Sequence, residues 1–187
     1  MTQKLWQKKL KLNYSKDIFD IVQFGSSITD EKPNDVDIAV IFSKIPIKEQ
    51  LNQSQEIKKH LQTESELPVH IHAFDLYSFF LPSNFAKENI LFYGKSIISK
   101  EYFAIKFGLN PSMQIFYSLR ELKKKGKIRF NYMLNGKQGK YGLLRQYGGK
   151  IIAPGLIEIS PEHEKIFVDT INLLTNKFTI KKTYTYI

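Results

Sequence analysis

The sequence has no cysteine among its 187 residues, and it has no apolar run that approaches the ~20 residues of a membrane span. The absence of thiols excludes disulfide bonds and thiolate metal sites. Lys4, Lys8, Lys9 and Lys11 interrupt the N-terminal segment, which therefore lacks the apolar core of a secretion signal. From these absences we expect a cytoplasmic protein with no membrane partner.

Acidic residues are scarce in one segment of the chain, so the net charge of +10 is unevenly spread. Residues 1–110 carry 14 Lys and Arg against 13 Asp and Glu, and residues 151–187 carry 4 of each. Residues 111–150 carry 10 Lys and Arg against Glu121 alone, a balance of +9. Attraction to anionic partners is therefore expected from this segment.

Helix and strand patterns occur in both halves of the chain, which predicts an α+β (mixed α/β) fold. In the first half, apolar runs predict a small sheet with strands at about 18–24, 36–43 and 69–74. Helices are expected at 3–12, 47–62 and 83–92. In the second half, we expect a hairpin at 151–159, a helix from Ser160 to about Thr175, and a strand at 178–186.

A break at residues 108–111 predicts the domain boundary, with one domain at 1–106 and a basic α+β domain at 107–187. Asn110 can cap a helix whose first position is Pro111. Five apolar residues then recur at helical spacing: Met113, Ile115, Phe116, Leu119 and Leu122. The expected helix ends at Gly126, which would place the lysines before it favourably at the helix C-terminus.

A short polar segment between two of the predicted strands carries the clearest chemical signal. Gly25 and Ser26 end the first apolar run, and Asp35 and Asp37 open the next. Alternate residues of a strand project from one face, so both carboxylates point to the same side. Two hard oxygen ligands suit a divalent cation such as Mg²⁺, and a Gly-Ser turn offers N–H groups and a hydroxyl to a phosphate. A polar turn alone would not explain an Asp inside an apolar strand, where an unpartnered charge is costly.

This segment resembles the signature of the nucleotidyltransferase superfamily that includes DNA polymerase β: an apolar residue, Gly-Ser, a gap, and Asp-x-Asp leading into an apolar strand. The resemblance covers about residues 15–100 and implies a minimal domain of the polymerase β-like type. It implies that Mg²⁺ (or Mn²⁺) and a nucleoside triphosphate bind here. The implied catalytic and metal-binding residues are Asp35 and Asp37, and the implied nucleotide-binding residues are Gly25, Ser26 and, as a weaker candidate, Ser27.

The family usually carries a third acidic residue on the next strand, and this chain departs from that pattern. The aligned position is His70, and His72 lies on the same face two residues later. Asp75 ends the strand with the opposite parity, so it could contribute only after a bulge or a turn. Three interpretations stay open. A histidine replaces the acid, as a base or as a softer metal ligand that favours Mn²⁺; Asp75 supplies the oxygen; or the third ligand is absent and the histidines only pack.

The basic segment 111–150 interleaves its charges with aromatic rings, a combination that suits a nucleic-acid groove. The rings are those of Phe116, Tyr117, Phe130, Tyr132, Tyr141 and Tyr147. The candidate nucleic-acid contacts are Arg120, Lys123, Lys124, Lys125, Lys127, Arg129, Lys140 and Arg145. A solvated helix face above core aromatics has the same composition, so both interpretations stay open.

The main prediction is a metal-dependent nucleotidyltransferase that moves a nucleoside monophosphate from a triphosphate to an acceptor hydroxyl and releases pyrophosphate, with nucleic acid as the expected acceptor. One alternative is a catalytically degenerate module that binds nucleic acid or an acidic partner. Another is an enzyme of the same family with a protein or small-molecule acceptor. The positive segment argues against a cationic small molecule. The sequence carries no signal for the base preference or the oligomeric state.

Overall fold

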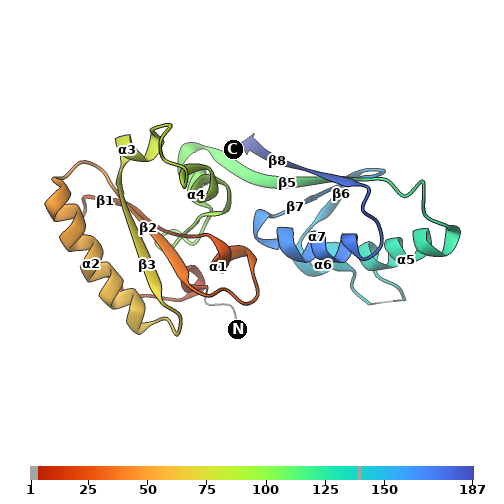
Figure 1. Ribbon diagram of the computed structural model, residues 1–187, viewed down its shortest axis with the longest axis horizontal. Coiled ribbons are helices and arrows are strands. Elements are labelled where there is room, and N and C mark those ends of the chain that lie inside the picture. Colours follow the sequence, from red (N-terminus) through yellow and green to blue (C-terminus); the bar gives the residue numbers. More distant parts are fainter. Residues whose placement is uncertain (1–3, 139) are drawn as a thin grey trace. The chain divides into compact units, whose positions relative to one another are not determined.

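The computed structural model describes residues 4–138 and 140–187 and divides the chain into two compact units, Met1–Gly108 and Leu109–Ile187. Each unit combines one four-stranded sheet with helices, which confirms the predicted α+β class (Figure 1). Within the described residues, every helix is too short or too polar to span a bilayer. The division falls two residues after the boundary expected from the sequence.

The sheet of the first unit has the strand order β3-β2-β1-β4. Its strands are β1 (Ile18–Phe24), β2 (Val36–Phe42), β3 (Val69–Asp75) and β4 (Lys95–Ser96). β1 runs antiparallel to β2 and β4, whereas β2 and β3 are parallel. Parallel neighbours need a crossover connection, and α2 (Ile47–Thr63) provides it. The three long strands and α2 confirm the sequence predictions for these elements.

Alternate residues of β2 pack into two separate cores. Ile38 joins Ile57 of α2 on one face of the sheet. Ala39 joins Phe79 and Phe103 on the other face, which α3 (Leu76–Phe80), α4 (Lys87–Tyr93) and η2 (Phe103–Phe107) cover (Figure 1). Asp37 has the parity of Ala39 and therefore projects from this second face, away from α2.

Two helix predictions in this unit need correction. The helix expected at 3–12 is only the short 3₁₀ turn η1 (Leu5–Gln7), and residue 3 lies outside the described residues. Lysines there supply few apolar points for a helix face to bury. α3 was not predicted from the sequence. It is only five residues long, which is too short to show a helical pattern of apolar residues. The side chain of Asp75 caps its N-terminus.

The sheet of the second unit is antiparallel and has the order β6-β7-β5-β8. Its strands are β5 (Leu109–Tyr117), β6 (Lys150–Ala153), β7 (Leu156–Ile159) and β8 (Phe178–Tyr186). Its helices are α5 (Lys124–Asn135), α6 (Leu143–Tyr147), η3 (Pro161–His163) and α7 (Glu164–Asn172). The β6–β7 hairpin, the helical segment after Ser160 and the last strand confirm the sequence predictions.

The helix expected from Pro111 to Gly126 is wrong. Pro111, Met113 and Ile115 recur with a period of two, and all three are buried between exposed or half-buried neighbours. Pairing with both β7 and β8 stabilises the extended form. Pro111 is tolerated because it pairs only with β8, whereas pairing with β7 begins at Met113. The helix α5 begins where the expected helix was to end, so Gly126 lies inside it.

Candidate functional site

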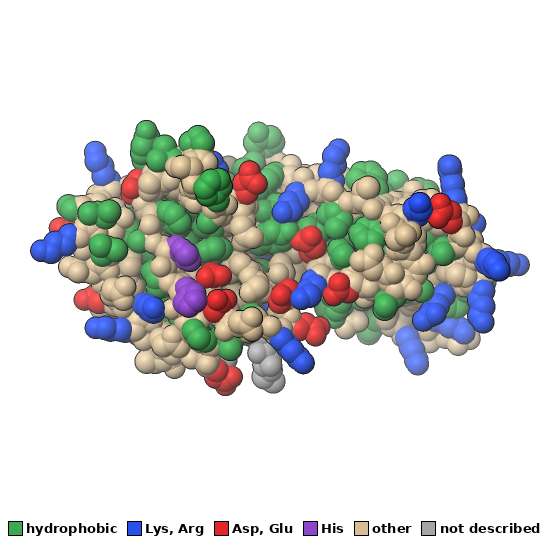
Figure 2. Space-filling view, viewed as in Figure 1, with side chains coloured by type: hydrophobic (Ala, Val, Ile, Leu, Met, Phe, Trp, Pro, Cys, Tyr) green, Lys and Arg blue, Asp and Glu red, His purple; other side chains and the backbone are tan. Residues whose placement is uncertain are grey.

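The two aspartates of the sequence motif lie together at the start of β2. Asp37 is the second residue of the strand, and Asp35 immediately precedes it. One oxygen of each carboxylate and a ring nitrogen of His70 all lie within 4.8 Å of one another, so the three side chains could hold a metal ion. The side chains of Asp35 and Asp37 are 34% and 25% exposed, which leaves both open to a ligand. Histidine and acidic side chains adjoin on this surface in Figure 2.

Strand register brings both histidines of β3 to the same face. Asp37 pairs with His70 in the parallel ladder, and His72 follows two residues later. Nδ1 of His70 lies 3.6 Å from Oδ2 of Asp35 and 4.0 Å from Oδ1 of Asp37. Nε2 of His72 lies 3.6 Å from the same Oδ1 of Asp37, and its ring packs edge-on against Phe24. Both imidazoles therefore lie beside the carboxylate of Asp37.

Asp75 lies away from this group, at the opposite end of β3. It pairs with Phe42, the last residue of β2. Its carboxylate accepts a hydrogen bond from the backbone N–H of Ser78 at 2.8 Å and caps α3. That hydrogen bond lowers the pKa of Asp75. The structure therefore does not bring Asp75 to the other two aspartates, and this candidate metal ligand is a helix cap.

The turn at Gly25 lies directly against one of the carboxylates. Phe24 pairs with Asp37, so the end of β1 is level with the start of β2. Gly25 has a φ of +75°, and a Cβ atom placed on it would lie 2.7 Å from Oδ2 of Asp37. Both the backbone conformation and the close approach therefore require glycine. The turn at Gly25 and the carboxylate of Asp37, which the sequence motif placed near each other, therefore lie in contact.

The two serines of the turn are placed differently. Ser26 is exposed at the start of α1 (Ser26–Thr29), where its hydroxyl is open to a ligand. Ser27 is buried, and its hydroxyl accepts a hydrogen bond from Nε2 of Gln23 at 2.9 Å and donates one to the carbonyl of Phe24 at 3.1 Å. The Ser27 hydroxyl, a weaker candidate for phosphate binding, is therefore used by the fold.

Asn89 is a neighbour of the site that the sequence did not identify. It lies on α4, and its Oδ1 accepts a hydrogen bond from the backbone N–H of Gly25 at 3.2 Å. This contact helps to fix the position of the turn beside Asp37. Because it depends on the packing of α4 beside β1, no local sequence pattern marks it.

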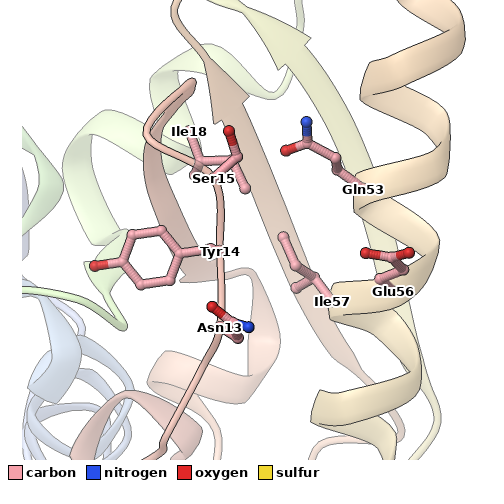
Figure 3. Close-up of a pocket in the computed structure, with 7 residues that line it drawn as sticks. All are labelled: Asn13, Tyr14, Ser15, Ile18, Gln53, Glu56 and Ile57. Atoms are coloured by element: carbon pink, nitrogen blue, oxygen red, sulfur yellow. The ribbon is translucent and has the colours of Figure 1, made fainter.

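A pocket of about 370 Å³ in the first unit is separate from the carboxylates (Figure 3). Seven residues line it: Asn13, Tyr14, Ser15, Ile18, Gln53, Glu56 and Ile57. Ile18 and Ile57 belong to the core beneath α2, whereas Asp37 projects from the other face of the sheet. The candidate metal site is therefore an open surface, and this pocket is not part of it.

The basic residues of the second unit lie at the surface around α5. All eight candidates for nucleic-acid contact are exposed, and Figure 2 shows Lys and Arg side chains gathered over the part of this unit that holds α5 in Figure 1. Lys123 is the N-cap of α5, and Lys124 and Lys125 follow it, with no acid in the first turn. Cations at a helix N-terminus oppose the helix dipole at a cost of about 0.3–1 kcal/mol each. These lysines therefore raise the positive potential without stabilising the helix.

The aromatic residues of the basic segment divide into core and surface groups. Phe130 is buried and packs on Tyr117 at a ring distance of 4.7 Å, and Tyr147 packs on Phe167. Tyr132 and Tyr141 are exposed, as is Phe116 on β5. Cations lie over both exposed tyrosines: Lys137 Nζ is 5.2 Å from the Tyr132 ring centroid, and the Arg145 guanidinium carbon is 4.3 Å from that of Tyr141. Part of the segment is thus core, and part is a basic surface with accessible rings.

No protein-family model, curated protein or solved structure matches this chain. Membership of the nucleotidyltransferase superfamily therefore stays a prediction from the motif. The function has to be inferred from the geometry of the site.

Proposed function

We propose that this protein is a metal-dependent nucleotidyltransferase. The observation that carries the proposal is the approach of Gly25 to Asp37: a Cβ atom placed on the glycine would lie 2.7 Å from a carboxylate oxygen, and Asp35 and His70 lie beside that carboxylate. A turn that offers a hydroxyl and lies against paired carboxylates suits a nucleoside triphosphate with its cation. Nucleotidyl transfer needs the phosphate-binding turn and the cation-binding carboxylates close enough to contact the same triphosphate.

The residues have separate roles in the proposed reaction. Asp35 and Asp37 hold a divalent cation, Mg²⁺ or Mn²⁺, and Ser26 contacts the β- and γ-phosphates. A cation bound there would offset negative charge on the entering and leaving oxygens. The acceptor hydroxyl oxygen forms a bond to the α-phosphorus, the bond from that phosphorus to the β-phosphate oxygen breaks, and pyrophosphate leaves. The hydroxyl proton passes to a base of the site.

Nucleic acid is the acceptor class that the second unit favours. The exposed cations around α5 suit a phosphate backbone, and the rings of Tyr132 and Tyr141 are accessible for stacking on bases. Stacking on an exposed ring needs an unpaired base, so single-stranded acceptors are favoured over duplexes. Glu121 is the one acid of residues 111–150, and Lys177 pairs with it at 3.6 Å, so it offsets little of the positive charge.

The test uses nucleoside triphosphates that carry the label at either of two positions. Protein is incubated with each α-labelled triphosphate and Mg²⁺ or Mn²⁺, with and without total RNA or single-stranded DNA. Nucleotidyl transfer predicts that the α-label enters the acceptor and that a γ-label is recovered in pyrophosphate. Entry of the γ-label into the acceptor would show phosphoryl transfer and would overturn the proposal.

Variants of the carboxylates make the same test specific to the site. We expect Asp35→Asn to slow transfer by about a hundredfold or more, because several kcal/mol of transition-state stabilisation depend on the bound cation. Glu31→Gln is the matched control: it makes the same change of charge at an exposed position in the same loop, and it should keep full activity. Equal rates for the two variants would contradict the assignment.

A second candidate, a binding module without turnover, is favoured by the histidine at the position of the third acid. It predicts nucleic-acid binding with no label transfer under any of these conditions. The logarithm of affinity should then fall against the logarithm of salt with a slope of about −0.7 to −0.9 for each phosphate contacted. Binding that is insensitive to salt would contradict a role for the basic surface in either candidate function.

A further inference from the structure

The donor set at the start of β2 is mixed in its chemistry. Asp35 and Asp37 offer oxygen, whereas His70 and His72 offer nitrogen from the neighbouring strand. Asp75, the other acid considered for this site, caps a helix at the far end of β3. Among the described residues, the ion-pair partners of both aspartates are imidazoles, with no Lys or Arg. The third donor at this site is therefore an imidazole nitrogen.

The separations fit one bound ion. Ligand bonds of about 2.0–2.2 Å place donors that share an ion about 3–4.4 Å apart. The His70 nitrogen lies 3.6 and 4.0 Å from oxygens of the two aspartates, and these three side chains form the group that fits one ion. His72 lies 3.6 Å from Asp37 but outside that group. The side chain of His70 is 55% exposed, so its ring is accessible to an ion. The ring of His72 is 48% exposed and also packs on Phe24.

Imidazole ligands change which ion such a site accepts. Mg²⁺ prefers oxygen donors in octahedral geometry, whereas Mn²⁺, Co²⁺ and Zn²⁺ also accept imidazole nitrogen. We propose that His70 completes the metal site of this protein and makes it select a borderline first-row cation over Mg²⁺. This inference rests on the proposed function and deepens it, since it names the class of ion that the site uses.

The test compares metals on the whole chain and does not depend on turnover. Co²⁺ is titrated while its visible absorption is recorded, because that spectrum reports nitrogen ligation. Mn²⁺ binding is followed by electron paramagnetic resonance, with Mg²⁺ as competitor. Each titration is repeated with a non-hydrolysable nucleoside triphosphate analogue, so that a site completed by the triphosphate is also observed.

Two variants test the His70 nitrogen, and a third variant is the control. His70→Asp replaces nitrogen by oxygen and should reduce the preference for Mn²⁺ over Mg²⁺, because Mg²⁺ prefers carboxylate oxygen to imidazole nitrogen. His70→Ala should weaken Co²⁺ binding and change its spectrum. His60→Ala is the control, since His60 is an exposed residue of α2. The exposure of His70 makes its variants compatible with folding, which circular dichroism checks.

The comparison with His70→Asp decides the outcome, because later first-row ions bind many sites more tightly than Mg²⁺. An unchanged Mn²⁺ to Mg²⁺ ratio in His70→Asp would overturn the inference, as would an unchanged Co²⁺ spectrum in His70→Ala or no metal binding at all. Label transfer supported equally by Mg²⁺ in wild type and His70→Asp would overturn it and leave the proposed function standing. Histidine-dependent metal selectivity without any label transfer would support the metal inference and overturn the proposed function.

Discussion

Two aspartates on one face of the first sheet show how differently the same side chain can be used. Asp20 on β1 pairs with Ile41, and Asp37 on β2 pairs with Phe24, so the two lie at opposite ends of the same ladder. The Asp20 side chain is fully buried, with the Ser96 hydroxyl 2.7 Å and the Lys106 ammonium 3.2 Å from its oxygens. Asp37 is partly exposed and lies beside two imidazoles, a second carboxylate and the turn at Gly25.

The difference separates an acid that serves the fold from an acid available to a ligand. A buried carboxylate is tolerated when a cation and a hydroxyl satisfy it, as at Asp20. At Asp37, a like-charged neighbour and solvent access make the site suitable for an added cation. The comparison predicts opposite responses to substitution at the two ends of the ladder.

The largest expected effect is on stability, at the buried end. Asp20→Ala should lower the free energy of unfolding by about 3 kcal/mol, because it leaves the Ser96 hydroxyl and the Lys106 ammonium without their partner. Urea denaturation of the variant and wild type measures this change. A loss as large in Asp37→Asn would mean that both aspartates serve the fold, and the contrast between them would fail.

The next largest effect tests the contact between the Gly25 turn and the carboxylate of Asp37. Gly25→Ala should cost about 1–3 kcal/mol, because its φ of 75° and ψ of −157° lie in a region that essentially only glycine adopts, and it should also displace the carboxylate of Asp37. We expect it to abolish binding of a nucleoside triphosphate with its cation, measured by calorimetry. Gly108→Ala is the control for a positive φ: its φ is +71°, its conformation is αL, and an added Cβ meets nothing within 4 Å. If both variants bind alike, the contact has no role in binding.

The sequence predicted β1, β2 and β3 well because each is an apolar run bounded by polar turn residues. The same regularity placed Asp35 and Asp37 on one face and set Gly25 close to them. It could not tell whether His70 or Asp75 lies beside the two aspartates. That placement depends on the β2–β3 register and on a helix cap, both of which are set by contacts distant in sequence or by a very short element.

The second unit was harder to predict, because Met113 and Ile115 fit the period of a strand, whereas Met113 and Phe116 fit that of a helix. Pairing with two neighbouring strands decided for β5, and nothing in the local residues reveals those neighbours. The basic segment was found from its charge alone. Which of its rings are core and which are accessible depends on tertiary packing, as Phe130 and Tyr132 show.

A smaller effect, of opposite sign in stability and binding, is expected at α5. Lys124→Glu with Lys125→Glu should raise the free energy of unfolding by about 0.3–1 kcal/mol per residue, since acids at a helix N-terminus suit its dipole. The same change should weaken binding to single-stranded oligonucleotides and make the salt slope shallower by about 0.7 per lost phosphate contact. Urea denaturation measures the first effect, and fluorescence anisotropy at several salt concentrations measures the second.

Lys48→Glu in the first turn of α2 is the control for this double variant. It makes the same kind of change at an exposed helix N-terminus outside the basic segment. It should stabilise the protein slightly and leave oligonucleotide binding unchanged. Equal binding by the double variant and this control would remove the basic surface from the proposed function.

The smallest effect is on the pH dependence of stability. Burial raises the pKa of Asp20, so its contribution is present below the unfolded pKa of 3.8 and is lost as the pH rises through the folded value. The Ser78 N–H lowers the pKa of Asp75, so its contribution is present above 3.8 and is lost as the pH falls through the folded value. Asp20→Asn should therefore gain stability relative to wild type as the pH rises above about 4, and Asp75→Asn should gain as the pH falls below it. Denaturation between acid and neutral pH that shows the same slope for both variants would contradict the contrast.

Ligand-induced stabilisation tests the candidate site at Asp37 most directly, since it needs neither an acceptor nor turnover. The unfolding midpoint is measured with and without a non-hydrolysable nucleoside triphosphate analogue plus Mn²⁺, for wild type and Asp37→Asn. A ligand that binds only the folded state at 100 times its Kd adds about 2.7 kcal/mol. We predict a raised midpoint for wild type and none for Asp37→Asn. The same increase in both proteins, or none in wild type, would contradict a cation and nucleotide site at Asp35 and Asp37.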